Sequence, residues 1–210
     1  SSKHTGISFL LIDMASEGVS TRPIKLISGK SPFCETFFDS VKVPKANLVG
    51  TLNDGWTIAK YLLTHERQMI GGIGETDKKL HISDEAINVM SKNNGILSDT
   101  ILRSKISEFE MNEEIFDLTI RRTMDEEKSG NNSGAASSFF KYYGTELNIQ
   151  REELRLKING FSSTEWNSKA SENGKQARYF CRTKGNSIEG GTHEVQLNII
   201  AKRILGLPTK

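Results

Sequence analysis

The first part of the chain alternates short runs typical of β-strands with clusters of turn-forming residues. Three runs are rich in β-branched and aromatic residues and are separated by glycine, serine and proline: GISFLLIDM, VSTRPIKLI and CETFFDSVKV. The first of them predicts a buried strand that begins almost at the first residue, an unusual start for a natural domain. We therefore expect the chain to be a fragment that begins inside a β domain.

The spacing of the apolar residues changes to a helical period after Gly55. Amphipathic stretches bounded by glycine and other turn-forming residues predict helices over the following ranges: 56–70, 81–90, 101–127, 135–158, 175–182 and 192–205. The whole pattern predicts an α+β fragment. An incomplete β-barrel or sheet segment over residues 1–53 precedes an antiparallel helical bundle over residues 54–210.

The composition is that of an ordinary globular protein, with 36% apolar and 26% charged residues. The 28 basic and 26 acidic side chains leave a net charge of +2 and are scattered along the chain. Nucleic-acid binding is not expected, because it normally requires a basic stripe or patch. The apolar runs fall well short of the roughly 20 residues that a membrane-spanning helix needs, so no membrane span is expected either.

The two cysteines, Cys34 and Cys181, lie far apart and lack a Cys-x-x-Cys or cysteine-histidine spacing. Neither a disulfide framework nor a metal site is predicted from them. This cysteine usage favours a reducing, cytoplasmic location.

Glu66 occupies an unusual position on the helix predicted over residues 56–70. It comes four residues after Leu62 and four before Ile70, so it interrupts the apolar stripe. A carboxylate at such a position is either paired with a cation such as Arg67, or desolvated and therefore suited to removing a proton from carbon. The pattern alone leaves both interpretations open.

A glycine turn precedes the last predicted helix, in the sequence SIEGGTHEVQ. Thr192 is a good N-cap, and the N–H groups at the start of a helix form a ready phosphate site. Gly190 and Gly191 carry no side chains, so a ligand can approach the backbone closely. A capped helix without any ligand explains the same residues, and spacing alone does not decide between the two.

The remaining histidines and aromatic residues considered as site residues are explained by structural roles alone. His65 and His193 lack a partner at metal-ligand or catalytic-triad spacing, and we expect them to face solvent or to be hydrogen-bonded. The aromatic run FFKYY over residues 139–143 is predicted to belong to the core, because a helix spreads such rings around its circumference.

Three stretches of the chain, in order, resemble the C-terminal half of acyl-CoA dehydrogenases. GISFLLIDMASEGVSTRPI is similar to the end of the family's middle β domain, CETFFDSVKVPKANLVGTLNDGW to the exit into its C-terminal helical domain, and GGTHEVQLNIIAKRILGLP to its closing motif. The resemblance implies FAD as cofactor and an acyl-CoA thioester as substrate, with α-proton abstraction and β-hydride transfer to the flavin. It also implies an electron-transferring flavoprotein as electron acceptor, and a homo- or hetero-oligomer, either a dimer or a tetramer.

The resemblance assigns FAD contacts to three residues. Thr192 and Glu194 match the closing motif and are expected to face the adenine and diphosphate side of FAD. Gly160 belongs to an Asn-Gly-Phe sequence that matches the stretch through which relatives bind FAD across a dimer interface. The glutamine and paired glycines that usually precede this sequence are replaced in LRLKINGF, and the family's Arg-x-x-Phe-Gly sequence is not evident after Gly71.

The closing motif lacks the usual catalytic glutamate. Many relatives carry it immediately before the Gly-Thr pair, where this chain has Gly190, and Glu189 lies one residue too early on the segment. Other relatives place the base before an arginine on the first helix of the C-terminal domain, where this chain has Glu66 and Arg67. The resemblance therefore predicts Glu66 as the base and Arg67 as a contact to the CoA moiety.

The loss of the usual glutamate side chain is compatible with the chemistry. The α C–H of a thioester is a weak acid, so the developing enolate oxygen must be stabilised while the proton is removed. In relatives a backbone N–H at the position of Gly190 donates to this oxygen, and glycine keeps that N–H. We therefore expect Gly190 to serve catalysis through its backbone, and Gly191 to contact the substrate.

Two alternatives keep the same fold. In the first, the chain belongs to a non-catalytic partner subunit that contributes an FAD-binding interface to a heteromeric dehydrogenase. In the second, it belongs to a flavin oxidase or monooxygenase. Replacing Glu66 with glutamine tests the first alternative, and the rate at which oxygen reoxidises the reduced flavin tests the second.

Overall fold

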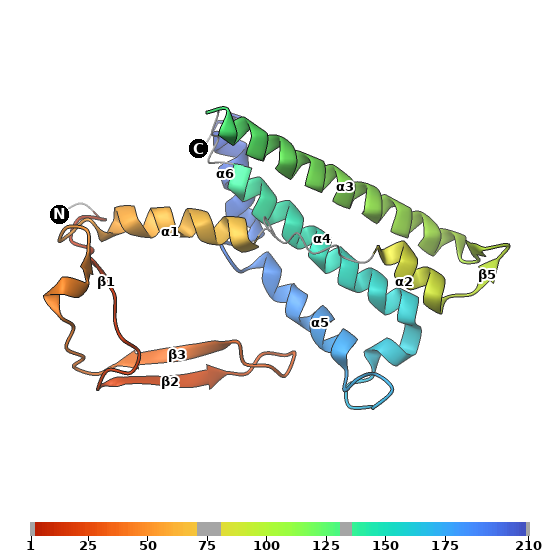
Figure 1. The fold of residues 1–210 in the computed structure, drawn as a ribbon, viewed down its shortest axis with the longest axis horizontal. Helices are drawn as coiled ribbons and strands as arrows, with labels where there is room; N and C mark the ends of the chain where they lie inside the picture. The colour runs from red at the N-terminus through yellow and green to blue at the C-terminus, as the bar shows by residue number, and fades with distance from the viewer. Residues whose placement is uncertain (1–2, 71–80, 131–135, 209–210) are drawn as a thin grey trace. The chain divides into compact units, whose positions relative to one another are not determined.

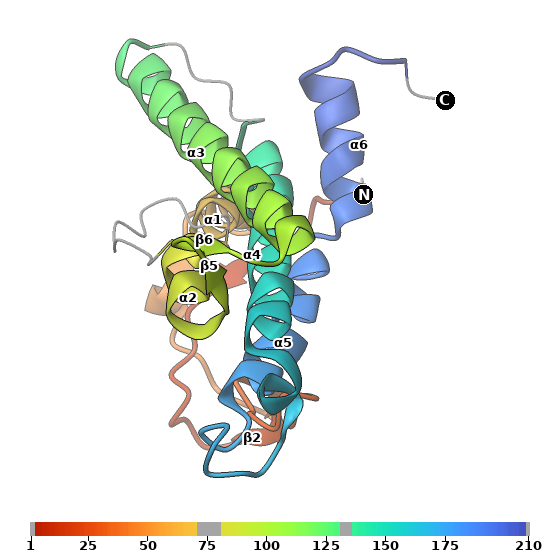
Figure 2. The ribbon, with the colours of Figure 1, turned by 90° about the vertical axis from the view of Figure 1, so that its right-hand side faces the viewer.

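The computed structural model describes residues 3–70, 81–130 and 136–208. The chain forms two compact units, Ser1–Glu66 and Arg67–Lys210, and helix α1 (Gly55–Ile70) continues from the first into the second. Figures 1 and 2 show the ribbon from two directions.

The first unit contains two-stranded ribbons before α1. β2 (Val19–Ile24) pairs antiparallel with β3 (Phe33–Phe38) along its whole length. β1 (Phe9–Leu10) pairs antiparallel with β4 (Leu48–Val49), which follows the 3-10 helix η1 (Lys45–Asn47). The described strands form no closed barrel, in agreement with the predicted incomplete β segment.

The first predicted strand is shorter than expected and is not buried. Only Phe9–Leu10 is paired as a strand, and the side chains of Leu10 and Leu11 are 46% and 59% exposed. A two-stranded ribbon covers neither of its faces, so the apolar residues of GISFLLIDM lack a packed layer in the described part of this unit. The prediction of a buried strand is therefore wrong for this structure.

The second unit is a helical bundle with one small hairpin. Its elements follow in this order: α2 (Ile82–Val89), β5 (Lys92–Asn93), β6 (Ile96–Leu97), α3 (Thr100–Lys128), α4 (Ala136–Asn159), η2 (Gly160–Thr164), α5 (Lys175–Thr183), η3 (Lys184–Ser187) and α6 (His193–Arg203). Helix α4 is central, because it packs against α2, α3, α5 and α6, and it runs back along α3 in the opposite direction (Figures 1 and 2). Each helical range predicted from the sequence corresponds to one of the helices α1 to α6.

Apolar side chains from α2, α3 and α4 form the core of this bundle. Its buried members are Ile82, Ala86, Leu97, Leu102, Ile106, Phe109, Phe116, Phe140, Leu147, Leu154 and Ile158. The aromatic run of α4 packs into it, because the ring centroid of Phe116 lies 6.0 Å from that of Phe140 and 5.8 Å from that of Tyr143. The prediction that this run belongs to the core is confirmed.

A polar network connects α2, α4 and α5 beside the core. Arg155 on α4 donates through Nε to Oε2 of Glu85 at 2.8 Å and through Nη1 to Oε1 of Glu152 at 2.6 Å. Glu152 is 4% exposed and also accepts a hydrogen bond of 2.6 Å from Gln176 on α5. The hydrogen bond to Glu85 and the charge of Glu152 raise the pKa of the Arg155 guanidinium further above its usual range. One guanidinium therefore neutralises two carboxylates that are both largely removed from water.

Candidate functional site

The turn Gly190-Gly191-Thr192 leads into α6. Gly190 and Gly191 have φ angles of 63° and 92°, which residues with a side chain rarely adopt. Thr192 is the N-cap of α6, and its hydroxyl accepts a hydrogen bond of 3.3 Å from the N–H of Val195. The predicted N-cap is therefore confirmed.

Gln196 on α6 contacts this turn from the interior. Its side chain is 0% exposed, and its Nε2 donates to the carbonyl oxygen of Gly190 at 2.8 Å. A Cβ atom added to Gly191 would lie 2.7 Å from the same Nε2, so Gly191 has no room for a side chain. Sequence reasoning misses Gln196, because a glutamine on a helix gains this contact only through the conformation of the turn.

The backbone donors of the turn are open to a ligand. The N–H groups of Gly190 and Gly191 have no hydrogen-bond partner among the residues that the structure describes. Gly191 is exposed and Gly190 half-buried. Such donors suit a carbonyl oxygen or an anionic oxygen.

Glu194 already places a carboxylate at the start of α6. Its side chain is exposed, and its own backbone N–H and the Thr192 hydroxyl lower the pKa of its carboxyl group. An ionised carboxylate accepts hydrogen bonds from hydroxyl or amino groups and repels phosphate. The N–H groups of the two glycines precede this carboxylate in the chain and have no partner among the described residues.

Glu189, which precedes the turn, is engaged by neighbouring side chains. Arg182 on α5 places Nη1 2.7 Å from Oε1 of Glu189 and donates through Nη2 to Oε2 at 3.1 Å. Asn186 also donates to Oε2, at 3.3 Å. Both carboxylate oxygens thus have partners, which leaves Glu189 poorly placed to take a proton from a ligand.

His193 connects the start of α6 to α4. Its Nε2 lies 2.9 Å from Oγ1 of Thr145, and its Nδ1 lies 3.1 Å from Oε1 of Glu146. Burial of the ring and the positive charge of Lys141 lower the pKa of His193, while Glu146 acts in the opposite direction. The prediction of a hydrogen-bonded histidine is confirmed here.

Lys141 is a completely buried cation on α4. Its Nζ has no hydrogen-bond partner among the described residues. Burial lowers the pKa of its ammonium group, and the charges of Glu189, Glu194 and Glu146 oppose that effect. Sequence reasoning misses it as well, although the signal was present in a single lysine among the four aromatic residues of FFKYY.

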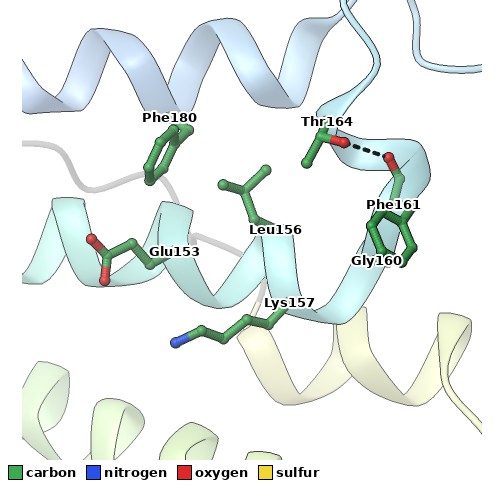
Figure 3. Close-up of a pocket in the computed structure, with 7 residues that line it drawn as sticks. All are labelled: Glu153, Leu156, Lys157, Gly160, Phe161, Thr164 and Phe180. Atoms are coloured by element: carbon green, nitrogen blue, oxygen red, sulfur yellow. Dashed lines mark hydrogen bonds between the residues drawn. The ribbon is translucent and has the colours of Figure 1, made fainter.

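Gly160 lies at the other end of α4, where it borders an apolar hollow of 470 Å³. The hollow is lined by Glu153, Leu156, Lys157, Gly160, Phe161, Thr164 and Phe180 (Figure 3). Gly160 has a φ of 62°, and the side chain of Phe161 is 93% exposed. Gly160 follows Thr145, the residue that His193 contacts, by fifteen positions along α4, and a helix of that length measures roughly 22 Å. The structure therefore does not bring Gly160 to the turn of α6.

Glu66 and Arg67 follow each other on α1. Glu66 is half-buried and is the last residue of the first unit, and Leu62 on the preceding turn is 53% exposed. The neighbouring ring of His65 is exposed and meets Tyr61 edge-on at 4.6 Å. The side chain of Arg67 lies outside the described residues, so its contacts stay a prediction.

Among the described residues, no group of histidine, cysteine, aspartate and glutamate side chains could hold a metal ion. None of the described helices is both long and apolar enough to cross a membrane.

The second unit is a helical-bundle domain whose last helix begins at backbone donors that have no partner among the described residues. Comparison with known families identifies it more closely, because the family model described as "Acyl-CoA dehydrogenase, C-terminal domain" matches residues 53–205. The chain belongs to the acyl-CoA dehydrogenase family.

Curated relatives carry the same family name. Acyl-CoA dehydrogenase IpdE1 of Mycolicibacterium smegmatis is 29% identical over 213 residues, which cover 99% of this chain and 51% of that protein. Acyl-CoA dehydrogenase FadE34 of Mycobacterium tuberculosis is 29% identical over 211 residues, which cover 98% of this chain and 27% of that protein. The chain thus spans about half the length of the first relative and less of the second.

Solved structures share the fold. One described as "Tcur3481-Tcur3483 steroid ACAD" matches with a TM-score of 0.84 at 25% identity, covering 100% of this chain and 54% of that one. The ChsE4-ChsE5 complex from Mycobacterium tuberculosis matches with a TM-score of 0.76 at 27% identity, covering 99% and 55%. The fold predicted from the sequence is confirmed by these likenesses.

Proposed function

We propose that this chain is the C-terminal part of an FAD-dependent acyl-CoA dehydrogenase, which introduces a double bond between the α and β carbons of an acyl-CoA thioester. The observation that carries the proposal is the turn before α6, where Gly190 and Gly191 have N–H groups without a partner among the described residues. Negative charge develops on the thioester oxygen as the α proton leaves, and preorganised N–H donors stabilise that charge. Membership of the family supports the reaction class.

Glu66 is the residue to which we assign removal of the α proton. Gly190 has no side chain that could accept the proton. The carboxylate oxygens of Glu189 are already in contact with Arg182 and Asn186. Glu66 is half-buried and is followed by an arginine, and the resemblance to the family implies a base at this place on the helix. We assign that arginine, at position 67, to contact with the CoA moiety.

FAD, when bound, supplies the acceptor for the β hydride. The start of α6 fits the adenosine half of this cofactor, because the ionised carboxylate of Glu194 can accept from its hydroxyl or amino groups, while it would repel the diphosphate. Gly160 and Phe161 border an apolar hollow that suits a flat aromatic group. Because roughly 22 Å of α4 separates the two places, we assign Gly160 to the FAD of a partner subunit.

An oligomer fits both this assignment and the surface of α3. Met111, Ile115 and Leu118 lie at helical spacing along α3 and are 61%, 57% and 52% exposed, so they form an apolar stripe that a partner can cover. Two similar structures bear paired names, "Tcur3481-Tcur3483 steroid ACAD" and the "ChsE4-ChsE5 complex". We therefore propose a homo- or hetero-oligomer, and an electron-transferring flavoprotein as its electron acceptor.

An anaerobic visible absorption spectrum of the full-length protein that carries this chain tests the proposal. We expect a flavin band that is bleached when one class of acyl-CoA is added. The panel should contain short, long and branched acyl-CoAs and a steroid-derived thioester, because one similar structure is described as a steroid ACAD. Absence of a flavin band, or a band that none of these thioesters bleaches, would contradict the proposal.

The same sample distinguishes the alternatives. A flavin oxidase or monooxygenase is indicated if air rapidly restores the band after bleaching, whereas a dehydrogenase needs an added electron acceptor. A non-catalytic partner subunit is indicated if the complex keeps its full activity when Glu66 is replaced by glutamine.

A further inference from the structure

We propose that Gln196 is a positioning residue, which holds the carbonyl group of Gly190 and thereby turns the N–H of Gly191 toward the ligand side of the turn. The inference rests on the proposed function, because it explains how one of the two backbone donors proposed for the thioester oxygen is oriented. It begins from the hydrogen bond of 2.8 Å between Nε2 of Gln196 and the carbonyl oxygen of Gly190.

The planarity of the peptide bond connects this hydrogen bond to the opposite side of the turn. The carbonyl group of Gly190 and the N–H of Gly191 belong to one peptide unit, and in a trans unit they point in opposite directions. Since the carbonyl group faces the buried side chain of Gln196, the N–H faces away from it. This N–H has no hydrogen-bond partner among the described residues and is free to meet a ligand.

A Gly-Gly peptide unit rotates more easily than other peptide units, so a contact such as this hydrogen bond is needed to fix its orientation. Neither glycine has a Cβ atom, and both have positive φ angles, so the unit can rotate at little steric cost. The backbone of this turn therefore does not fix the orientation of the Gly190–Gly191 peptide unit by itself. The hydrogen bond from Gln196 fixes the orientation of this unit. The Nε2 atom of Gln196 also leaves no room for a side chain at Gly191.

The surroundings of Gln196 do not favour a purely structural role. Its side chain is completely buried, but its Oε1 has no hydrogen-bond partner among the described residues. A buried acceptor without a partner lowers stability, so an apolar side chain of similar length would fill the space at lower cost. Replacing Gln196 with methionine makes that change and gives up the hydrogen bond to Gly190.

The first measurement reports the orientation of the peptide unit without using activity. Glycine labelled with ¹³C at the carbonyl and with ¹⁵N gives doubly labelled units only at Gly-Gly bonds, which occur in this chain at residues 71–72 and 190–191. In the full-length protein, Gly191→Ala identifies the 190–191 resonance by its loss. We expect Gln196→Met to shift this resonance or split it into two exchanging forms, and to leave the 71–72 resonance in place. An unchanged 190–191 resonance would overturn the inference.

The second measurement is the rate of anaerobic flavin bleaching by the acyl-CoA that reduces the wild-type protein. We expect Gln196→Met to lower this rate about 10- to 100-fold, because a misdirected donor no longer stabilises the developing negative charge. The Kd of the acyl-CoA should change by less than about threefold, because the donor acts mainly on the transition state.

Gln176→Met is the matched control, because Gln176 is a half-buried glutamine of the same unit whose Nε2 donates to Glu152. Gln176→Met should lower the melting temperature and leave the rate of flavin bleaching unchanged. Gln196→Met should leave the melting temperature unchanged and lower the rate of flavin bleaching. The positioning role is overturned if the Gln196→Met protein is bleached at the wild-type rate. It is also overturned if the lower bleaching rate is accompanied by a lower melting temperature that accounts for it. Failure of every acyl-CoA to bleach the wild-type protein overturns the proposed function instead, and the labelled resonance alone then decides whether Gln196 holds the peptide.

Discussion

At the scale of single residues, His193 makes the folded state sensitive to acid. Burial and the charge of Lys141 lower its pKa below the ordinary value of 6.5, against the opposing charges of Glu146 and Glu194. The unfolded chain therefore takes up this proton more readily than the folded chain does. The contribution of His193 to the free energy of unfolding is present above about pH 6.5 and is lost as the pH falls through the lowered pKa of the folded state.

Denaturant unfolding at about pH 7 and about pH 5 measures this effect. We expect His193→Gln to lose less stability than the wild-type protein between the two pH values. His65→Gln is the matched control for the substitution itself, because the ring of His65 is exposed on α1. Equal pH dependence in the wild-type and His193→Gln proteins would contradict this account.

The role of a residue can be predicted from the sequence when that role depends on residues close to it in the chain. Thr192 was found because an N-cap is a local arrangement of one hydroxyl and the next turn of helix. Gln196 and Lys141 were missed because their importance depends on burial and on the conformation of a turn, which local pattern does not reveal. Glu66 was singled out by its place in an apolar stripe, and its role stays a prediction.

At the scale of elements, the start of α6 depends on its cap. Thr192→Ala removes the oxygen that accepts from the N–H of Val195 and should lower the free energy of unfolding by about 1 kcal/mol. Thr192→Ser keeps that oxygen and should lose much less. Chemical denaturation of both variants measures the difference, and equal losses would show that the cap hydrogen bond is not the cause.

The connection between α2, α4 and α5 depends on Arg155. Arg155→Met leaves Glu85 and the 4%-exposed Glu152 without their cation, and should lower the free energy of unfolding by about 3–5 kcal/mol. Arg122→Met is the matched control, because the ion pair of Arg122 with Glu126 is exposed and should contribute less than about 1 kcal/mol. Similar losses in the two variants, measured by denaturant unfolding, would contradict the assigned role of the network.

Helices were predicted more accurately than strands for a physical reason. The apolar period of α3 and α4 identifies the face that packs, and the hydrogen bonds of a helix are internal to the element. A strand needs partners from elsewhere, and GISFLLIDM forms only the two-residue strand β1 because the described part of its unit offers one short partner. The period of the sequence alone could not show that its apolar residues would be exposed.

At the scale of the whole molecule, the described units are parts of a longer protein. The chain spans about half the length of its relative IpdE1, so the proposed activity belongs to the full-length protein. The family could be recognised from three stretches of sequence, whereas the substrate could not, because no described feature selects one acyl group.

The measurement that tests this account most directly is anaerobic, single-turnover bleaching of the flavin by acyl-CoA in the full-length protein and its Glu66→Gln variant. Loss of a general base typically costs 10²- to 10⁴-fold in rate, so we expect bleaching to slow by about that factor in Glu66→Gln. Glu35→Gln, at an exposed glutamate of β3 in the same unit, should bleach at the wild-type rate. Glu189→Gln should keep more than about a tenth of that rate, because Glu189 is assigned to Arg182 and not to the substrate. Bleaching at the wild-type rate in Glu66→Gln, or a wild-type protein that no acyl-CoA bleaches, would contradict the account.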